Sequence, residues 1–212
     1  MTPVALNTIR TSVVLFLFAV IGTAMMAYTY KKTEPIIERS TQAEKLALIT
    51  QVMPPTLYDN DLLANSRALP ANDLLGTRKT SNAWLATKHG QPAGIVLEAI
   101  APEGYSGNIA LLIGIDANGV ITGVRVTQHK ETPGLGDYIE LGKSRWIEQF
   151  TGKSLPENSE ALWRVKKDGG EFDSRAGATI TPRAIVKAVR EALKYFHAHR
   201  ADLLQPNPVK QP

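Results

Sequence analysis

The sequence of 212 residues predicts an α+β protein: one N-terminal transmembrane helix, followed by a domain in which helices pack on an antiparallel sheet. Three observations predict it. An uncharged run of about 20 residues lies near the start, β-rich runs follow one another over 94–126, and an apolar stripe at helical spacing lies within 182–204. We expect four parts, namely an anchor at 1–32, a helical and irregular connection at 33–80, the main domain at 81–204 and a flexible tail at 205–212.

Composition excludes several classes of function. Cysteine is absent, so the chain has no disulfide and no thiolate that could hold zinc or an iron–sulfur cluster. Only His197 and His199 are close in sequence, and positions two apart on a helix point in different directions, so we expect no metal site. The net charge of +4 is spread along the chain without a basic cluster, and we therefore expect no nucleic-acid partner.

The first element is the uncharged run Thr11–Tyr30. Its length matches the hydrocarbon core of a bilayer, with Arg10 before it and Lys31 after it. A cleavable signal peptide is the alternative, because it also combines a basic flank with an apolar run. The run is longer than a usual signal core and lacks a clear small-residue cleavage site, which favours a permanent anchor.

The orientation of this helix is ambiguous. The positive-inside rule weighs Lys31, Lys32 and Arg39 after the span against Arg10 and the amino terminus before it. Taken alone, this count disfavours export of the domain that follows.

The connection between anchor and domain begins with Glu34 and Pro35, where we expect a helix break. A polar helix is expected to resume as far as about Val52, with Pro54 and Pro55 ending it. From there to about Thr80 the composition predicts irregular structure on the domain surface.

Three strands are expected at 94–100, 108–115 and 120–126. Asn118 and Gly119 separate the last two, and we expect both to adopt the positive φ angles of a tight hairpin turn. The sequence therefore places an antiparallel sheet at the centre of the domain.

Two helices should pack on that sheet. Trp146, Ile147 and Phe150 have helical spacing within 144–150. The longer helix, at about 182–204, combines an apolar stripe with a charged outer face. The stripe consists of Ile185, Val189, Ala192 or Leu193, and Phe196, and the outer face consists of Lys187, Arg190, Glu191 and Lys194.

The segment DSRAGATITP at 173–182 is the first that could carry chemistry. We expect Thr181 to be the N-cap of the long helix and Pro182 its first residue. A well-capped helix is a sufficient explanation of this pattern. A helix N-terminus also attracts phosphate, and Arg183 could either add a hydrogen bond to the phosphate or face solvent.

The second segment is ETPGLGD at 131–137. It can be simply a turn, but Gly134 and Gly136 would also let backbone amides approach a flat ligand, with Leu135 against its ring. His129 and Glu131 stand beside the turn, where they either line a site or lie on the surface.

Both segments resemble the FMN-binding domain found in the G subunit of the Rnf electron-transport complex and in the C subunit of the sodium-translocating NADH:quinone reductase. In that family the first segment is the recognition sequence of a flavin transferase, and it corresponds here to Asp173, Gly177, Ala178, Thr179 and Thr181. The resemblance implies that the FMN phosphate is esterified to Thr181. Thr179 is a rival acceptor on chemistry alone, and Ala176 departs from the Ser or Thr common at its position.

The second segment matches a family turn that lies against the isoalloxazine ring. Its residues are Thr132, Pro133, Gly134, Leu135 and Gly136. Because the two motifs occur in the same order in one chain, their agreement is more specific than that of either alone.

By resemblance, the chain is an electron-transfer subunit of an ion-translocating redox complex in the bacterial inner membrane, with its domain in the periplasm. Its expected partners are the other subunits and, during maturation, a flavin transferase. We expect no catalytic residues and no independent turnover, because no nucleophile and base form a recognisable motif. The length favours the Rnf protein, with its quinone-reductase counterpart as the alternative. A membrane-anchored binding module without cofactor and a free-standing flavin reductase are two further classes.

Overall fold

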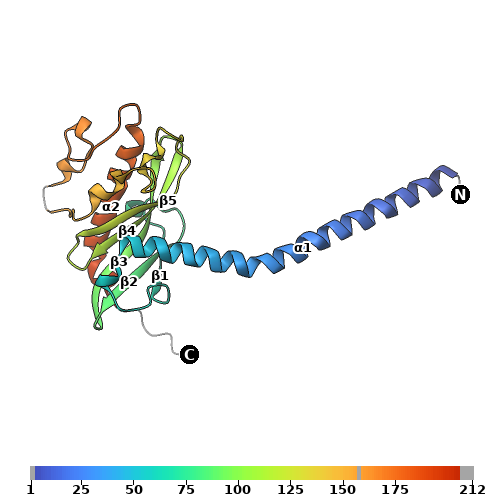
Figure 1. Cartoon of the computed structure of the whole chain (residues 1–212), viewed down its shortest axis with the longest axis horizontal. Helices are drawn as coiled ribbons and strands as arrows, with labels where there is room; N and C mark the ends of the chain where they lie inside the picture. Colours follow the sequence, from blue (N-terminus) through green and yellow to red (C-terminus); the bar gives the residue numbers. More distant parts are fainter. Residues whose placement is uncertain (1–2, 157–158, 206–212) are drawn as a thin grey trace. The chain divides into compact units, whose positions relative to one another are not determined.

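The computed structural model describes residues 3–156 and 159–205 and confirms the α+β class. An N-terminal helix, α1 (Pro3–Val52), precedes a five-stranded antiparallel sheet, and a second long helix, α2 (Ile180–Leu203), follows the sheet (Figure 1). The chain divides into two compact units, Met1–Lys45 and Leu46–Pro212, which we describe separately.

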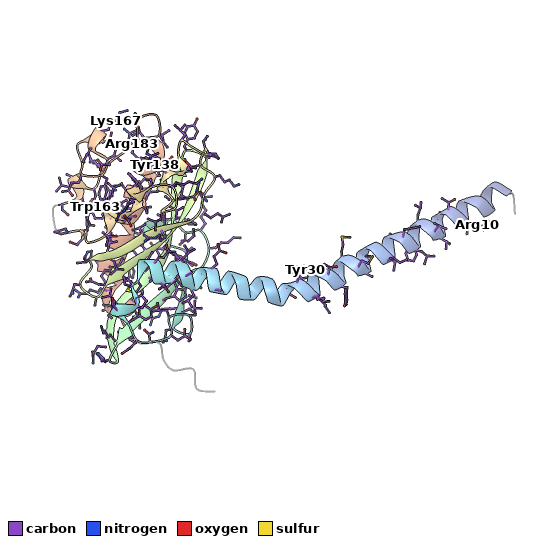
Figure 2. All side chains as sticks on the ribbon, in the orientation of Figure 1. Arg10, Tyr30, Tyr138, Trp163, Lys167 and Arg183 are labelled. Atoms are coloured by element: carbon purple, nitrogen blue, oxygen red, sulfur yellow. The ribbon has the colours of Figure 1, made fainter. Side chains whose placement is uncertain are left out.

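The first unit contains the segment Ile9–Glu34 of α1, whose 26 residues and mean hydropathy of 2.0 suit a membrane span. At 1.5 Å per residue this segment is about 39 Å long, more than the bilayer core of about 30 Å. Apolar side chains are exposed all around it, among them Phe16 at 67% and Phe18 at 71%. Figure 2 shows Arg10 and Tyr30 on this helix. Such a surface suits the hydrocarbon core of a membrane.

The expected helix break at Pro35 is wrong, because α1 continues through Glu34 and Pro35. A proline removes one backbone donor, and the residues on either side still form their own helical hydrogen bonds. The helix ends at Val52, immediately before Met53 and the two prolines, as expected.

The second unit is built on a sheet with strand order β1-β2-β3-β4-β5. The strands are β1 (Ser66–Leu69), β2 (Ser81–Lys88), β3 (Gln91–Gly104), β4 (Gly107–Asp116) and β5 (Ile121–Gln128). The three expected strands are β3, β4 and β5. Strands β1 and β2 were not expected, and β1 lies where irregular structure was predicted. In β2, consecutive residues are buried on both faces, so polar residues do not alternate with apolar ones.

The turn between β4 and β5 differs from the expected one at Asn118. Gly119 has a φ of 88°, but His89 is the one described non-glycine residue with positive φ, so Asn118 does not share it. The Asp116 carboxylate organises this turn: its Oδ1 accepts the N–H groups of Asn118 and Val120, both at 2.8 Å. One residue in the left-handed conformation, Gly119, is therefore enough to close this turn.

Hydrophobic clusters cover the two faces of the sheet. Helix α2 packs on one face, where Ile185, Val189 and Phe196 are fully buried against the strands, as the predicted stripe requires (Figure 1). The last turn of α1 and the segment after it pack on the other face. That second cluster consists of Ile49, Val52, Met53, Leu62, Trp84, Ala86, Val96 and Leu112.

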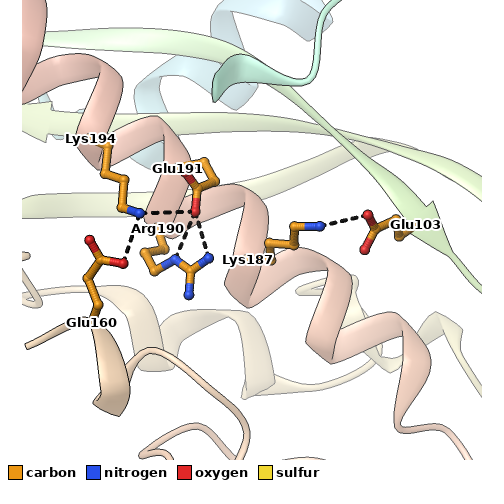
Figure 3. A network of polar contacts seen from close by, with 6 residues as sticks. All are labelled: Glu103, Glu160, Lys187, Arg190, Glu191 and Lys194. Carbon is orange, nitrogen blue, oxygen red and sulfur yellow. Dashed lines mark hydrogen bonds and ion pairs between the residues drawn. The ribbon is translucent and has the colours of Figure 1, made fainter. Parts of the chain in front are cut away.

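The outer face of α2 carries the predicted charges, and these form ion pairs both within the helix and with neighbouring elements (Figure 3). Within the helix, Arg190 pairs with Glu191. Lys187 pairs with Glu103 of β3 at 2.6 Å, and Lys194 pairs with Glu160 at 2.9 Å. Partly exposed pairs of this kind stabilise a fold only modestly. Their effect here is to fix the outer face of α2, whose N-terminus forms part of the site described next.

The expected short helix is a 3-10 helix, η4 (Arg145–Phe150), in which Ile147 and Phe150 are buried. Trp146 packs edge-on between Tyr138 and Phe150, with both ring centroids 5.6 Å away. This aromatic group lies beside the loop that leads into α2.

Candidate functional site

The two predicted segments meet at one cavity of about 120 Å³. The turn after β5 contributes Glu131, Thr132, Leu135 and Gly136 to its lining. The loop and first turn of α2 contribute Gly177, Ala178, Thr179, Ile180 and Thr181. Tyr105, at the tip of the β3–β4 hairpin, completes the lining. Pro133 and Gly134 belong to the same turn but lie outside the lining.

Thr181 is placed differently from the expectation, because it is not the N-cap of α2. The helix begins at Ile180, and Thr179 holds the cap position without a side-chain capping bond to any described residue. Pro182 is therefore the third residue of the helix. The side chain of Thr181, which is 1% exposed, turns instead to the other motif, and its Oγ1 donates a 2.5 Å hydrogen bond to Oε2 of Glu131.

Glu131 is itself buried, at 4% exposure. Its Oε1 accepts the backbone N–H of Ser106 at 3.0 Å, and its own N–H donates to Nδ1 of His129 at 3.0 Å. His129 contacts Glu140 through Nε2 at 2.7 Å and is outside the cavity lining. Of the two residues beside the turn, Glu131 thus lines the site, whereas His129 lies outside the lining and accepts the backbone N–H of Glu131.

The turn 132–137 is held by its own backbone and by one carboxylate. The N–H groups of Leu135 and Gly136 donate to the carbonyl of Thr132, at 3.1 and 3.0 Å. Gly134 has a φ of 77°, and its N–H donates to Oδ1 of Asp137 at 2.9 Å. This hydrogen bond lowers the pKa of Asp137 most, burial opposes the shift, and the nearby Lys143 ammonium adds to it.

Gly136 is where the two motifs approach most closely. A Cβ atom at this position would lie 2.9 Å from Oε2 of Glu131 and 3.4 Å from Oγ1 of Thr181. The absence of a side chain therefore permits the contact between Glu131 and Thr181. At Gly134, by contrast, glycine is required by backbone conformation, because no described atom would lie within 4 Å of a Cβ there.

Tyr138 contacts the loop before α2. The hydroxyl of Tyr138 accepts the N–H of Arg175 and donates to the carbonyl of Ala178, both at 3.4 Å, and the Arg175 guanidinium lies 4.6 Å from the ring centroid. Burial raises the pKa of Tyr138, against the opposing effects of the Arg175 amide and charge. At the start of the loop, Trp146 Nε1 donates to the carbonyl of Asp173 at 2.7 Å.

Arg183 does not point a free charge at the cavity. Its Nε and one terminal nitrogen bind both oxygens of Asp168, at 2.6 and 2.5 Å, and the residue is exposed. Hydrogen bonding to Arg183 is the main reason that the pKa of Asp168 is lowered.

The rim of the cavity is apolar. Tyr105, Leu135 and Ile180 are exposed by 66%, 47% and 47%, although large apolar side chains of the sheet unit are mostly buried. Sequence reasoning found Leu135 but missed Tyr105 and Ile180. A signal for Tyr105 was present, since Gly104 and Gly107 flank it in the connection between two expected strands, where a turn is favoured.

The cavity and its rim fit part of a planar, phosphate-bearing ligand. Its volume is below the roughly 300 Å³ of pockets that enclose a whole ligand. The first turn of α2 presents helix N–H groups and the positive end of the helix dipole, which suit a phosphate. The exposed rim residues suit a flat ring. Among the residues that the structure describes, no group of three His, Asp or Glu side chains could hold a metal ion.

Comparison with known proteins identifies related family models for both units. The model of an FMN-binding domain matches residues 104–194, and that of the RnfG N-terminal region matches residues 1–52. Three similar relatives are each named as the G subunit of an ion-translocating oxidoreductase complex. The Pseudomonas aeruginosa protein is 47% identical over 93% of this chain and 92% of its own length. The Vibrio cholerae protein is 45% identical over 95% of this chain and 96% of its own length. The Aliivibrio fischeri protein is 43% identical over 92% of this chain and 93% of its own length.

Proposed function

We infer the function from the family to which the chain belongs, that of the G subunits of ion-translocating oxidoreductase complexes. The chain carries an FMN-binding domain and one N-terminal helix suited to anchor it in a membrane. It is an electron-transfer subunit that works with the other subunits of its complex. A bound flavin accepts electrons singly or in pairs, and the protein supplies its position and its surroundings.

We propose further that FMN is attached covalently, through a phosphoester to Oγ of Thr181, by a flavin transferase. The observation that supports this most directly is the meeting of both motifs at one cavity, with Thr181 at its floor. Thr179 lines the same cavity and is the rival acceptor. Attachment keeps the flavin on the domain in a compartment without free FMN.

The residues around Thr181 would then have distinct roles. The N–H groups of Ile180 and Thr181 would bind the phosphate oxygens, because a helix leaves its first N–H groups without helical partners. Pro182, the next residue, has no N–H to add. Tyr105, Leu135 and Ile180 would contact the ring and cover its apolar edge. The turn 132–136 would bring its backbone amides close to the ring, as the family resemblance implies.

The presence of covalent flavin can be tested on the full chain. We would co-express it with a flavin transferase, denature it, and record its fluorescence in a gel together with its intact mass. A fluorescent band with a mass gain equal to FMN minus water supports the proposal. A colourless chain of unmodified mass, made beside a transferase that modifies a control protein, contradicts covalent attachment.

We also propose that the flavin domain faces the periplasm. The family resemblance supports this orientation, whereas Lys31 and Lys32 after the span favour the opposite one. Because the chain has no cysteine, a single cysteine placed at exposed Gly142 reports the orientation cleanly. Labelling of intact spheroplasts by a membrane-impermeant maleimide is expected, and labelling only after lysis would contradict the proposal.

A further inference from the structure

The hydroxyl proposed to accept FMN is buried in the folded chain. Thr181 is 1% exposed, and its Oγ1 is hydrogen-bonded to Oε2 of Glu131. A transferase must hold the flavin donor and the acceptor oxygen together within its own site. The cavity above Thr181 has a volume of about 120 Å³, which leaves no room for the active site of another protein. Thr181 must therefore leave its position before it is modified.

Glu131 is the fixed partner in this hydrogen bond. Its Oε1 accepts from Ser106, and its backbone N–H donates to His129. Gly104 and Gly136 approach it so closely that a Cβ atom on either would come within 3.0 Å of a carboxylate oxygen. Because the carboxylate is confined on these sides, the bond breaks through movement of Thr181.

The segment that contains Thr181 makes few buried contacts with the rest of the domain. Within 174–181, Ala178 and Thr181 are the buried residues, and the described part of the chain gives α2 no side-chain cap. The contacts of Tyr138 with this segment are long, at 3.4 Å. Segments with few buried contacts open locally at a fraction of the cost of global unfolding. Further along α2, Ile185 and Val189 are fully buried and hold the rest of the helix.

We propose that Glu131 is a latch on Thr181, and that the folded chain is flavinylated only after this hydrogen bond breaks and residues 174–181 open. The inference rests on the proposed attachment at Thr181. In the reaction, Oγ of Thr181 bonds to the FMN phosphorus of a flavin dinucleotide, and the phosphoanhydride bond breaks. The nucleoside monophosphate leaves, and the hydroxyl proton passes to its phosphate. No electron is transferred.

The test measures the initial rate at which a purified transferase and a flavin dinucleotide modify the folded full chain in detergent. The variants are Glu131→Ala and Glu131→Gln. The matched control is Glu103→Gln, which also removes a carboxylate that contacts α2 but lies on Lys187 rather than Thr181. Hydrogen exchange of peptides covering 177–183 is recorded on the same samples.

The latch predicts that Glu131→Ala raises the rate on the order of tenfold, because a hydrogen bond to a charged group no longer opposes opening. Glu131→Gln should raise it less, since the amide oxygen still accepts a weaker bond. Exchange at 177–183 should rise by a similar factor and exchange near Leu193 should not. Glu103→Gln should match the parent chain. If the alanine variant does not fold, the glutamine variant decides the question.

Rates equal to or below that of the parent chain would overturn the latch, and a slower Glu131→Gln would show that the carboxylate assists the chemistry. Faster modification without faster exchange would overturn it too. Failure of the latch is distinguishable from failure of the proposed attachment. If the parent chain gains FMN on Thr181 and the Glu131 variants are no faster, the latch alone is wrong. If neither the parent chain nor any Glu131 variant gains FMN on Thr181, the attachment is refuted.

Discussion

Thr181 and Glu131, 50 residues apart in the sequence, share a hydrogen bond of 2.5 Å at the floor of the cavity. This bond joins the start of α2 to the turn after β5. Gly136 makes the approach possible, and the N–H of Ser106 holds the other carboxylate oxygen. The bond thus connects the proposed FMN acceptor to the part of the domain that we expect to contact the ring.

Gly136→Ala should destabilise the domain. The new Cβ atom would lie 2.9 Å from Oε2 and 3.0 Å from Cβ of Glu131, so the turn must shift. Overpacking of this kind costs about 1–3 kcal/mol in the free energy of unfolding. Gly142→Ala is the matched control, because no described atom would lie within 4 Å of its Cβ. Denaturant unfolding of both variants checks the prediction, and equal stabilities would show that the contact is loose.

Tyr105→Ala should raise the fluorescence of the flavin in the native, modified protein. Tyr105 is 66% exposed at the cavity rim, where its phenol ring would contact and quench the isoalloxazine. Leu162→Ala removes another exposed apolar side chain, one outside the cavity lining, and should leave the emission unchanged. An equal emission spectrum for the Tyr105 variant would place the ring elsewhere.

Asp137→Asn should lower stability at neutral pH, with an effect that vanishes in acid. The pKa of Asp137 is lowered, chiefly by the N–H of Gly134. A lowered pKa means that the carboxylate stabilises the fold above its ordinary value of 3.8, and that this contribution is lost as the pH falls through the lowered pKa. Unfolding at neutral pH and well below 3.8 measures the difference between parent and variant. A difference that persists in acid would assign the effect to shape rather than charge.

Arg183→Gln should leave the yield of covalent flavin unchanged. Its guanidinium is bound by both oxygens of Asp168, so it does not serve the phosphate. In-gel flavin fluorescence normalised to protein measures the yield. A strong loss would mean that Arg183 exchanges Asp168 for the phosphate during modification.

The sequence predicted most of what depends on local pattern. Strands β3, β4 and β5 and the buried stripe of α2 follow directly from the spacing of apolar residues. Strand β2 was missed because it is buried on both faces, so its residues do not alternate. The extension of α1 through Pro35 was missed because a proline marks a probable boundary that the rest of the helix can override.

The site was predictable as two motifs but not as one contact. Capping rules assign Thr181 to the N-cap position of α2, whereas in the structure its hydroxyl donates a hydrogen bond to Glu131. That choice depends on how the sheet positions residues 50 apart, which no local rule contains. Tyr105 shows the same limit, because its role depends on where the β3–β4 hairpin tip meets the other two segments.

The measurement that tests the central claim most directly is peptide mass mapping of the full chain, co-expressed with a flavin transferase, in the parent, Thr181→Ala and Thr179→Ala forms. The account predicts a gain of FMN minus water on the peptide containing Thr181 in the parent and in Thr179→Ala, and none in Thr181→Ala. The Thr181 variant should still fold, at a cost of about 1–3 kcal/mol, because Glu131 loses a buried hydrogen-bond donor. Flavin retained on Thr181→Ala, or lost only from Thr179→Ala, would contradict the assignment of Thr181.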